Sequence, residues 1–223
     1  MVYRAMAADR GRVRLAPRFS RIVVPMLTAL LAFTGGCTGS SPDQQVQVHQ
    51  DGEGQLLLKL GDGLNAVNAT EQSPRTITFG AGNPCSTSGD KLTIESVDFE
   101  IAVKPLSMVK VWREVPDASE RTPDGNWEGV ISINGTPTEP TDKKALSGEM
   151  TTDIAGQEVS HNCSGDENQP FTELLVVVTV DGGGAWLKGV DVTYTGKRRT
   201  YKVHSGWNFI VCGTKTTASE GCH

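Results

Sequence analysis

Apolar and polar residues alternate along most of the chain after residue 55, which is the pattern of strands with one buried face. In the first such stretch leucines recur as Leu56, Leu58 and Leu60, and in the second Ile77 and Phe79 share one face. No run of ten or more residues has the spacing of an amphipathic helix. The pattern therefore predicts an all-β domain.

The clearest strand signal lies in the C-terminal third of the chain. Residues 174–180 are apolar on both faces and rich in valine, as expected for a central strand covered on both sides. Residues 190–195 and 201–204 alternate around a polar turn at 196–198, which predicts a half-buried hairpin. Residues 207–212 predict a further, last strand with Trp207, Phe209 and Val211 on one face.

The apolar phase changes once in the middle of the chain. Leu92 and Ile94 share one phase, whereas the apolar positions of residues 97–103 share the other. A slip at Glu95 and Ser96 reconciles the two phases and predicts a bulge or a bend between sheets.

Further strands and turns follow this segment. Residues 108–112 predict a strand, and the Pro- and Gly-containing residues 116–126 predict a loop. Residues 130–133 lead into Asn134-Gly135, a dipeptide that favours a tight hairpin turn, and residues 136–144 again read as a loop.

Some eight or nine short strands separated by turns favour a sandwich of two antiparallel sheets, immunoglobulin-like in general architecture, with a closed barrel as the alternative. We expect one domain over residues 55–223. Residues 37–54 are poor in large apolar side chains and predict a flexible tether, and residues 1–36 predict a signal peptide.

The signal peptide is predicted from charge and hydropathy. Six arginines and one aspartate precede an apolar run at residues 22–33, which is shorter than a bilayer span. Small residues follow, and Thr34-Gly35-Gly36-Cys37 resembles the lipobox of bacterial lipoproteins. The resemblance implies that Cys37 is diacylated and becomes the first mature residue. Plain secretion and an uncleaved anchor are the alternatives, and Met6 is an alternative start.

The net charge limits the classes of molecule that the protein is expected to bind. The 21 basic and 26 acidic residues include the six arginines and one aspartate before Cys37, so the remainder has 15 basic and 25 acidic residues, a net charge of about −10. Such a surface repels phosphate backbones, and we expect no nucleic-acid partner.

The cysteines indicate the same compartment. Setting Cys37 aside leaves an even set, whose long spacings differ from the paired ligands of a zinc site. We expect two disulfides, as in exported proteins, with all three pairings open. The four residues are Cys85, Cys163, Cys212 and Cys222.

Candidate chemistry is sparse. No histidine has a second ligand two to four residues on that makes a convincing metal pair, and His204 beside Ser205 lacks the G-x-S-x-G context of a hydrolase. Residues 160–168 gather oxygen donors, so calcium is conceivable, but a polar turn pinned by a cysteine is the ordinary explanation. Residues 182–184 are glycines without a following Lys-Ser/Thr, and we expect a strand connection. The histidines are His49, His161, His204 and His223.

The sequence thus favours a membrane-anchored, non-catalytic binding protein without a cofactor or metal, whose partner is a protein or an envelope polymer. Trp127, beside an acidic loop, is expected to be exposed and is a weak binding candidate, while Trp207 is expected in the core. The alternatives are an assembly factor of the envelope or a hydrolase with two carboxylates over a cleft. The carboxylates considered are Asp117, Glu120, Asp124, Asp166 and Glu167.

Overall fold

The computed structural model is all-β in the part of the chain that it describes, as the alternation predicts. The chain divides into two units, Met1–Ser41 and Pro42–His223, and every described residue belongs to the second. None of the described elements is a helix with the length and apolar content needed to cross a membrane. The described residues are 46–68, 73–115, 129–141, 145–164, 170–197, 199–219 and 221–222.

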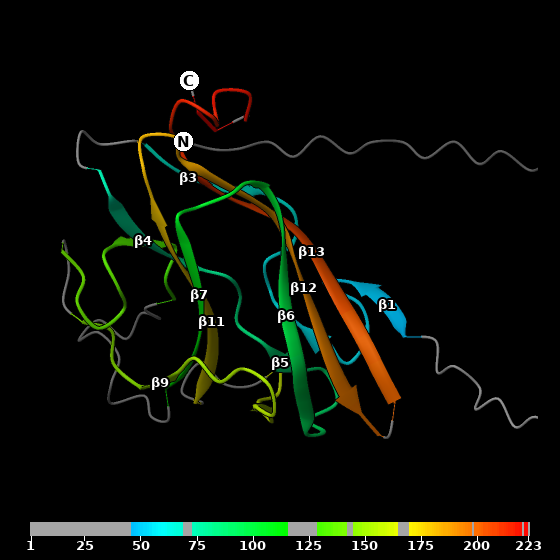
Figure 1. Cartoon of the computed structure of the whole chain (residues 1–223). Coiled ribbons are helices and arrows are strands. Elements are labelled where there is room, and N and C mark those ends of the chain that lie inside the picture. Colours follow the sequence, from blue (N-terminus) through cyan, green and yellow to red (C-terminus); the bar gives the residue numbers. More distant parts are fainter. Residues whose placement is uncertain are drawn as a thin grey trace, which may run out of the picture. The chain divides into compact units, whose positions relative to one another are not determined.

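The first sheet is built around three long antiparallel strands, β6, β12 and β13, which lie side by side in Figure 1. Two short N-terminal strands, β1 and β3, pair one after the other with the outer edge of β13, and both run parallel to it. This parallel pairing departs from the purely antiparallel prediction, because residues 51–63 loop out between two short segments that run in one direction. The strands are β1 (Gln47–Gln50), β3 (Leu64–Val67), β6 (Leu92–Val103), β10 (Glu158–Val159), β12 (Ala185–Gly196) and β13 (Arg199–Val211).

The second sheet has five antiparallel strands in the order β8-β4-β11-β7-β9, with β11 in the centre. The predicted central strand at residues 174–180 is therefore confirmed. A small third sheet pairs β2 with β5. The strands are β2 (Leu56–Leu57), β4 (Arg75–Gly80), β5 (Cys85–Ser86), β7 (Ser107–Val115), β8 (Ser132–Asn134), β9 (Glu149–Thr151) and β11 (Phe171–Val180).

The two large sheets pack face to face and enclose the main core (Figure 1). Leu174, Val176 and Val178 of β11 point into it and are completely buried. From the first sheet, Val192 and Tyr194 of β12 meet them. The predicted two-layer sandwich is thus the observed architecture. Burial on both faces of β11 arises because a second cluster covers its other side.

The phase change in β6 is a bulge, as predicted. Thr193 of β12 lies opposite Ser96, but Tyr194 lies opposite Ile94, so Glu95 has no partner of its own. The extra residue lets Ile94 and Val97 both point into the core.

The boundaries of two predicted strands were wrong. Residues 207–212 do not form a separate strand, because β13 continues to Val211 through a register shift opposite Gly189. The first leucine strand ends at Leu57, because Lys59 adopts a left-handed backbone conformation with φ 58°.

The predicted tether extends too far into the domain. Residues 47–50 form β1, and the carboxylate of Asp51 accepts hydrogen bonds from the backbone N–H groups of Leu58 and Leu60 at 2.7 and 2.8 Å. Polar composition alone does not reveal such an edge strand, because its hydrogen bonds come from β13. The part of the predicted tether before residue 46 lies outside the described residues.

Asn134 and Gly135 do not form the predicted tight hairpin turn. β8 pairs with β4, and the N–H of Gly135 donates to the carbonyl of Thr76 at 2.8 Å, so the dipeptide extends the strand. An isolated bridge joins Gly135 to Pro140, which places the chain reversal at residues 136–139.

Two disulfides are present, and the structure selects one of the three possible pairings. Cys85 is bonded to Cys163, and Cys212 is bonded to Cys222. Ser86, next to Cys85, also exchanges backbone hydrogen bonds with the segment around Cys163. The first disulfide therefore joins segments far apart in the sequence, whereas the second closes the C-terminal loop against β13.

Candidate functional site

Several residues predicted to carry function lie outside the described residues. These include Cys37 and Trp127. The same holds for all the carboxylates considered for a hydrolase: Asp117, Glu120, Asp124, Asp166 and Glu167.

His204 and Ser205 do not form a catalytic pair. Adjacent strand residues point to opposite faces, so His204 lies on the outer face of the first sheet while Ser205 points inward and is buried. The Nδ1 of His204 lies 2.7 Å from Oδ1 of Asp191. The Ser205 hydroxyl donates to the carbonyl of Gly61 at 2.8 Å.

The glycine and calcium candidates are structural turns in the part that is described. Backbone N–H groups of Thr214 and Lys215 donate to the carbonyls of Gly182 and Gly183, so the glycine segment holds the C-terminal loop. In the loop at residues 160–164, Asn162 Oδ1 accepts from the N–H of Ser164 at 3.0 Å and closes a local turn. Within the described ranges, no three side chains of His, Cys, Asp or Glu come together in a way that could hold a metal ion.

The described tryptophans serve packing. Trp112 is 1% exposed and points into the core, and Trp207 packs against the core as predicted. Trp186 lies on the outer face of the first sheet, where its indole N–H donates to Asn208 and the Lys188 ammonium lies 4.9 Å from the ring centroid. The aromatic ring is therefore engaged by neighbouring side chains.

A strand edge in the second sheet is open along residues 107–111. β7 pairs with β11 over its whole length, but on its other side β9 pairs only with Trp112, Arg113 and Glu114. After β9 the chain leaves the sheet and reaches β6, where the N–H of Gly156 donates to Ile94. Among the described residues, no backbone group completes the edge of β7 at 107–111.

The direction of the open hydrogen-bonding groups follows from the ladder. Both backbone groups of Leu174 bond toward the β4 side, to Ala81 and Gly82. Because backbone groups alternate in direction along an antiparallel strand, the odd-numbered neighbours in β11 bond toward β7. Their partners there include Val109, so the N–H and C=O groups of Met108 and Lys110 point to the open edge.

A cavity of about 490 Å³, called here the outer cavity, lies on the outer face of the second sheet beside this edge. Val177 of β11 and Val109 and Val111 of β7 form its floor, and Val109 is 43% exposed. The walls come from Met150 and residues 136–138 and 151–152. An exposed apolar depression of this kind is typical of a recognition surface.

A second cavity of about 410 Å³, called here the seam cavity, lies on the other side of β7, between β7 and the edge of β6. It is lined by Met108, Val97 and Ile154, and it shares Val109 and Thr152 with the outer cavity. The two cavities therefore flank the same open strand edge, one on each face of the sheet.

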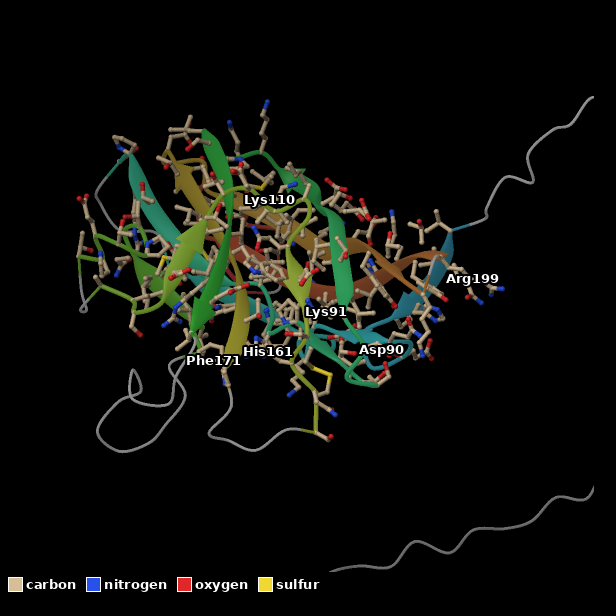
Figure 2. All side chains as sticks on the ribbon, turned by 90° about the horizontal axis from the view of Figure 1, so that it is seen from below. Asp90, Lys91, Lys110, His161, Phe171 and Arg199 are labelled. Atoms are coloured by element: carbon tan, nitrogen blue, oxygen red, sulfur yellow. A yellow bond between two sulfur atoms is a disulfide. The ribbon has the colours of Figure 1, made fainter. Side chains whose placement is uncertain are left out.

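Lys110 spans the seam. Its side chain is 29% exposed and its Nζ donates to the carbonyl of Val97 on β6, with Asp98 Oδ1 at 3.4 Å. Figure 2 shows the labelled Lys110 side chain in the space between these two strands. The one charged side chain on residues 107–111 is thus directed across the seam rather than outward, where it would guard the edge.

A buried ion pair holds the wall of the outer cavity. Arg113 of β7 and Glu173 of β11 face each other across the strands, with Nη1 and Oε2 2.7 Å apart and side chains 1% and 2% exposed. Glu173 Oε1 accepts from the N–H of Val130 at 2.6 Å, and Arg113 Nε donates to the carbonyl of Ser147 at 2.7 Å. The pair therefore fixes both ends of the segment that carries residues 136–138.

The environment of Glu173 is dominated by burial. Burial raises the pKa of Glu173 above its ordinary value, while the hydrogen bond from Val130 and the nearby Arg113 guanidinium act in the opposite direction. The Glu173 carboxylate can stay charged at this buried position only because the Arg113 guanidinium offsets the cost of removing it from water.

A third cavity, of about 540 Å³, is lined mainly by polar residues and meets the outer cavity at Thr136. Arg75 lines it, but this guanidinium donates to the carbonyl of Asn68 at 2.6 Å and to the side-chain oxygen of Asn134. Its cation is therefore committed to neighbouring backbone and side-chain groups.

Sequence reasoning missed the open edge and the buried ion pair. The alternation at residues 108–112 predicted a strand but contained no information on its partners. One signal for the ion pair was present: Glu173 directly precedes the apolar run at 174–180, and a carboxylate next to a fully covered strand is rarely left unpaired.

The chain was compared with known proteins, and it matches no protein-family model, no curated protein and no solved structure.

Proposed function

We propose that this protein is an exported, membrane-anchored binding protein that recognises a protein or an envelope component with the outer face of its second sheet. The observation that carries the proposal is the outer cavity, an apolar depression floored by Val109, Val111 and Val177. Water-exposed apolar surface is costly unless a partner covers it, so its presence favours recognition.

The compartment is part of the proposal. Two disulfides fit an oxidising environment outside the cytoplasm. The lipobox-like Thr34-Gly35-Gly36-Cys37 supports attachment of lipid to Cys37, and two acyl chains give stable anchoring where one is marginal. The acidic composition after Cys37 disfavours adsorption to anionic lipid, which makes an anchor more necessary.

Site-specific photo-crosslinking in living cells tests the recognition surface. A photoreactive side chain replaces Val109, and a matched control replaces Thr193, which lies on the outer face of the first sheet. We expect a discrete adduct from position 109 that Met150→Glu, a change in the wall of the outer cavity, abolishes. The same adducts from both positions, or an adduct insensitive to Met150→Glu, would contradict the proposal.

Fractionation tests the anchor. Cys37→Ala is expected to release the protein from membranes or to leave an unprocessed precursor, because the thiol that receives lipid is absent. A Cys37→Ala protein that stays in the membrane fraction at the processed mass would refute lipid attachment, without bearing on the outer cavity.

A further inference from the structure

We infer that the partner presents an extended polypeptide strand, which adds to the open edge of β7 at residues 107–111 and inserts alternate side chains into the outer cavity and the seam cavity. The inference rests on the proposed function, because it uses the same recognition surface, and it goes further by naming the chemical class of the partner.

The first argument is hydrogen bonding. The N–H and C=O groups of Met108 and Lys110 point to the open edge, and β9 continues the same ladder only from Trp112 onward. Donors and acceptors that alternate at the spacing of a strand are matched by another polypeptide backbone. A small apolar molecule in the outer cavity would leave the N–H and C=O groups of Met108 and Lys110 hydrogen-bonded only to water.

The second argument is the placement of the cavities. Successive side chains of an added strand point to opposite faces of the sheet. Beside Val109 such a side chain enters the outer cavity, and beside Met108 or Lys110 its neighbour enters the seam cavity. A single cavity would fit many ligands, but two cavities on opposite faces of one open edge fit the alternation of a strand.

The lining of the cavities defines the side chains of the strand. The outer cavity has an apolar floor, so this face of the strand carries aliphatic residues. The seam cavity contains Lys110 and Glu95 besides Met108 and Val97, so the other face carries small or polar residues. The inferred partner segment is therefore an extended stretch with aliphatic residues at every second position.

The probe is a panel of capped synthetic peptides of about seven residues, in which valine, leucine or isoleucine alternates with threonine. Matched control peptides carry the same side chains but are N-methylated on the amides that face β7, and therefore cannot pair along the edge. We expect at least one peptide to bind the full-length protein more tightly than about 1 mM, and its N-methylated form to bind about tenfold more weakly or not at all.

Two variants at one position separate backbone from side-chain effects. Lys110→Pro removes an N–H that faces the open edge and leaves the ladder to β11 in place, whereas Lys110→Ala removes only the side chain. We expect Lys110→Pro to lose at least about tenfold more peptide affinity than Lys110→Ala, because both variants lack the side chain in the seam cavity and only the proline variant lacks the N–H. Because proline can also disturb the fold, the melting temperatures of both variants are measured.

Amide hydrogen exchange provides a reading that does not depend on any variant. Bound peptide is expected to slow exchange at Met108 and Lys110, because only a paired backbone protects those amides. Unchanged exchange in the presence of bound peptide, equal affinity for the N-methylated peptide, or no binding by the whole panel overturns the inference.

The outcomes distinguish the inference from the proposed function. Peptide binding that is lost with Val109→Glu but leaves the amides of Met108 and Lys110 unprotected refutes strand addition and preserves the outer cavity as a recognition site. Protection of both amides that appears without peptide and grows with protein concentration assigns the edge to a second copy of this chain and refutes a partner strand. A position-109 adduct that Met150→Glu abolishes, together with no binding by the panel, likewise retains only the proposed function.

Discussion

Replacing Arg113 by methionine tests the account of the cavity wall. The change removes the guanidinium, while the Glu173 carboxylate, 2% exposed, still accepts the hydrogen bond from the N–H of Val130. Breaking a buried pair from one side costs about 3–5 kcal/mol, because an uncompensated charge stays in the interior. The exposures are so low that little of this cost is screened by solvent.

The double variant Arg113→Met/Glu173→Leu separates the charge effect from packing. Both charges are then gone, and the N–H of Val130 loses its acceptor, which costs about 1–3 kcal/mol. The hydrogen bond from Arg113 to the carbonyl of Ser147 is lost in the single and the double variant alike. We therefore expect the double variant to be more stable than Arg113→Met alone. The surface pair Lys91–Glu158, with side chains 71% and 55% exposed, supplies the control, and Lys91→Met is expected to leave the unfolding midpoint unchanged.

Urea unfolding measures these differences, provided that the slope with denaturant is the same in all variants. Dependence on pH adds a second reading. In Arg113→Met, burial without the arginine raises the pKa of Glu173 further, so the folded state holds its proton more tightly than the unfolded state. Stability of this variant then falls as pH rises through the raised pKa, and its deficit against the parent is smaller near about pH 4 than near about pH 8.

Two results would refute this reasoning. One is a loss of less than about 1 kcal/mol in Arg113→Met, which would mean that water or another group compensates the carboxylate. The other is a double variant whose loss equals the sum of the losses in Arg113→Met and in Glu173→Leu, since the effects of changing two residues in direct contact are not additive.

Further predictions concern the core, the disulfides and one histidine. Leu174→Ala is expected to cost about 2–5 kcal/mol in urea unfolding, whereas Ile131→Ala, at a side chain 75% exposed, is expected to stay within about 0.5 kcal/mol. Removing the Cys85–Cys163 disulfide, with a sequence separation of 78, is expected to destabilise the protein more than removing Cys212–Cys222, with a separation of 10. The loss of chain entropy in the unfolded state gives about 4.5 kcal/mol for the first disulfide and about 2.8 kcal/mol for the second. Calorimetry of the two paired alanine variants checks this order, and the reversed order contradicts the prediction. Burial lowers the pKa of His161, so the unfolded state binds a proton more readily and stability falls as the pH drops below the ordinary histidine pKa of 6.5. In His161→Asn the melting temperature is expected to decline less over this pH range. An unchanged decline would show that His161 is not its cause.

Local pattern was sufficient for much of the fold. Alternation located the strands around Ile77, Phe99, Val176 and Val192, because the positions of the apolar residues within each strand indicate which side chains face the core. The bulge at Glu95 was predicted for the same reason, since a phase change is visible within a single strand. The odd cysteine count also led to two disulfides once Cys37 was set aside.

Pairing between distant segments was decided only in three dimensions. The sequence could not choose Cys85–Cys163, nor predict that residues 47–50 join β13, because both depend on where other segments lie. The Asn134-Gly135 turn was predicted wrongly for this reason: a local preference gave way to the hydrogen bond with Thr76.

The candidate site is the strongest example of this division. Alternation identified a strand at residues 108–112, and that is a property of the segment itself. Whether Met108 and Lys110 have a neighbour is a property of the sheet, fixed by β9 pairing only from Trp112 onward. Side-chain periodicity is a local property that can be identified within one segment of the sequence. Whether a strand edge is unpaired depends on the positions of all the other strands in the sheet.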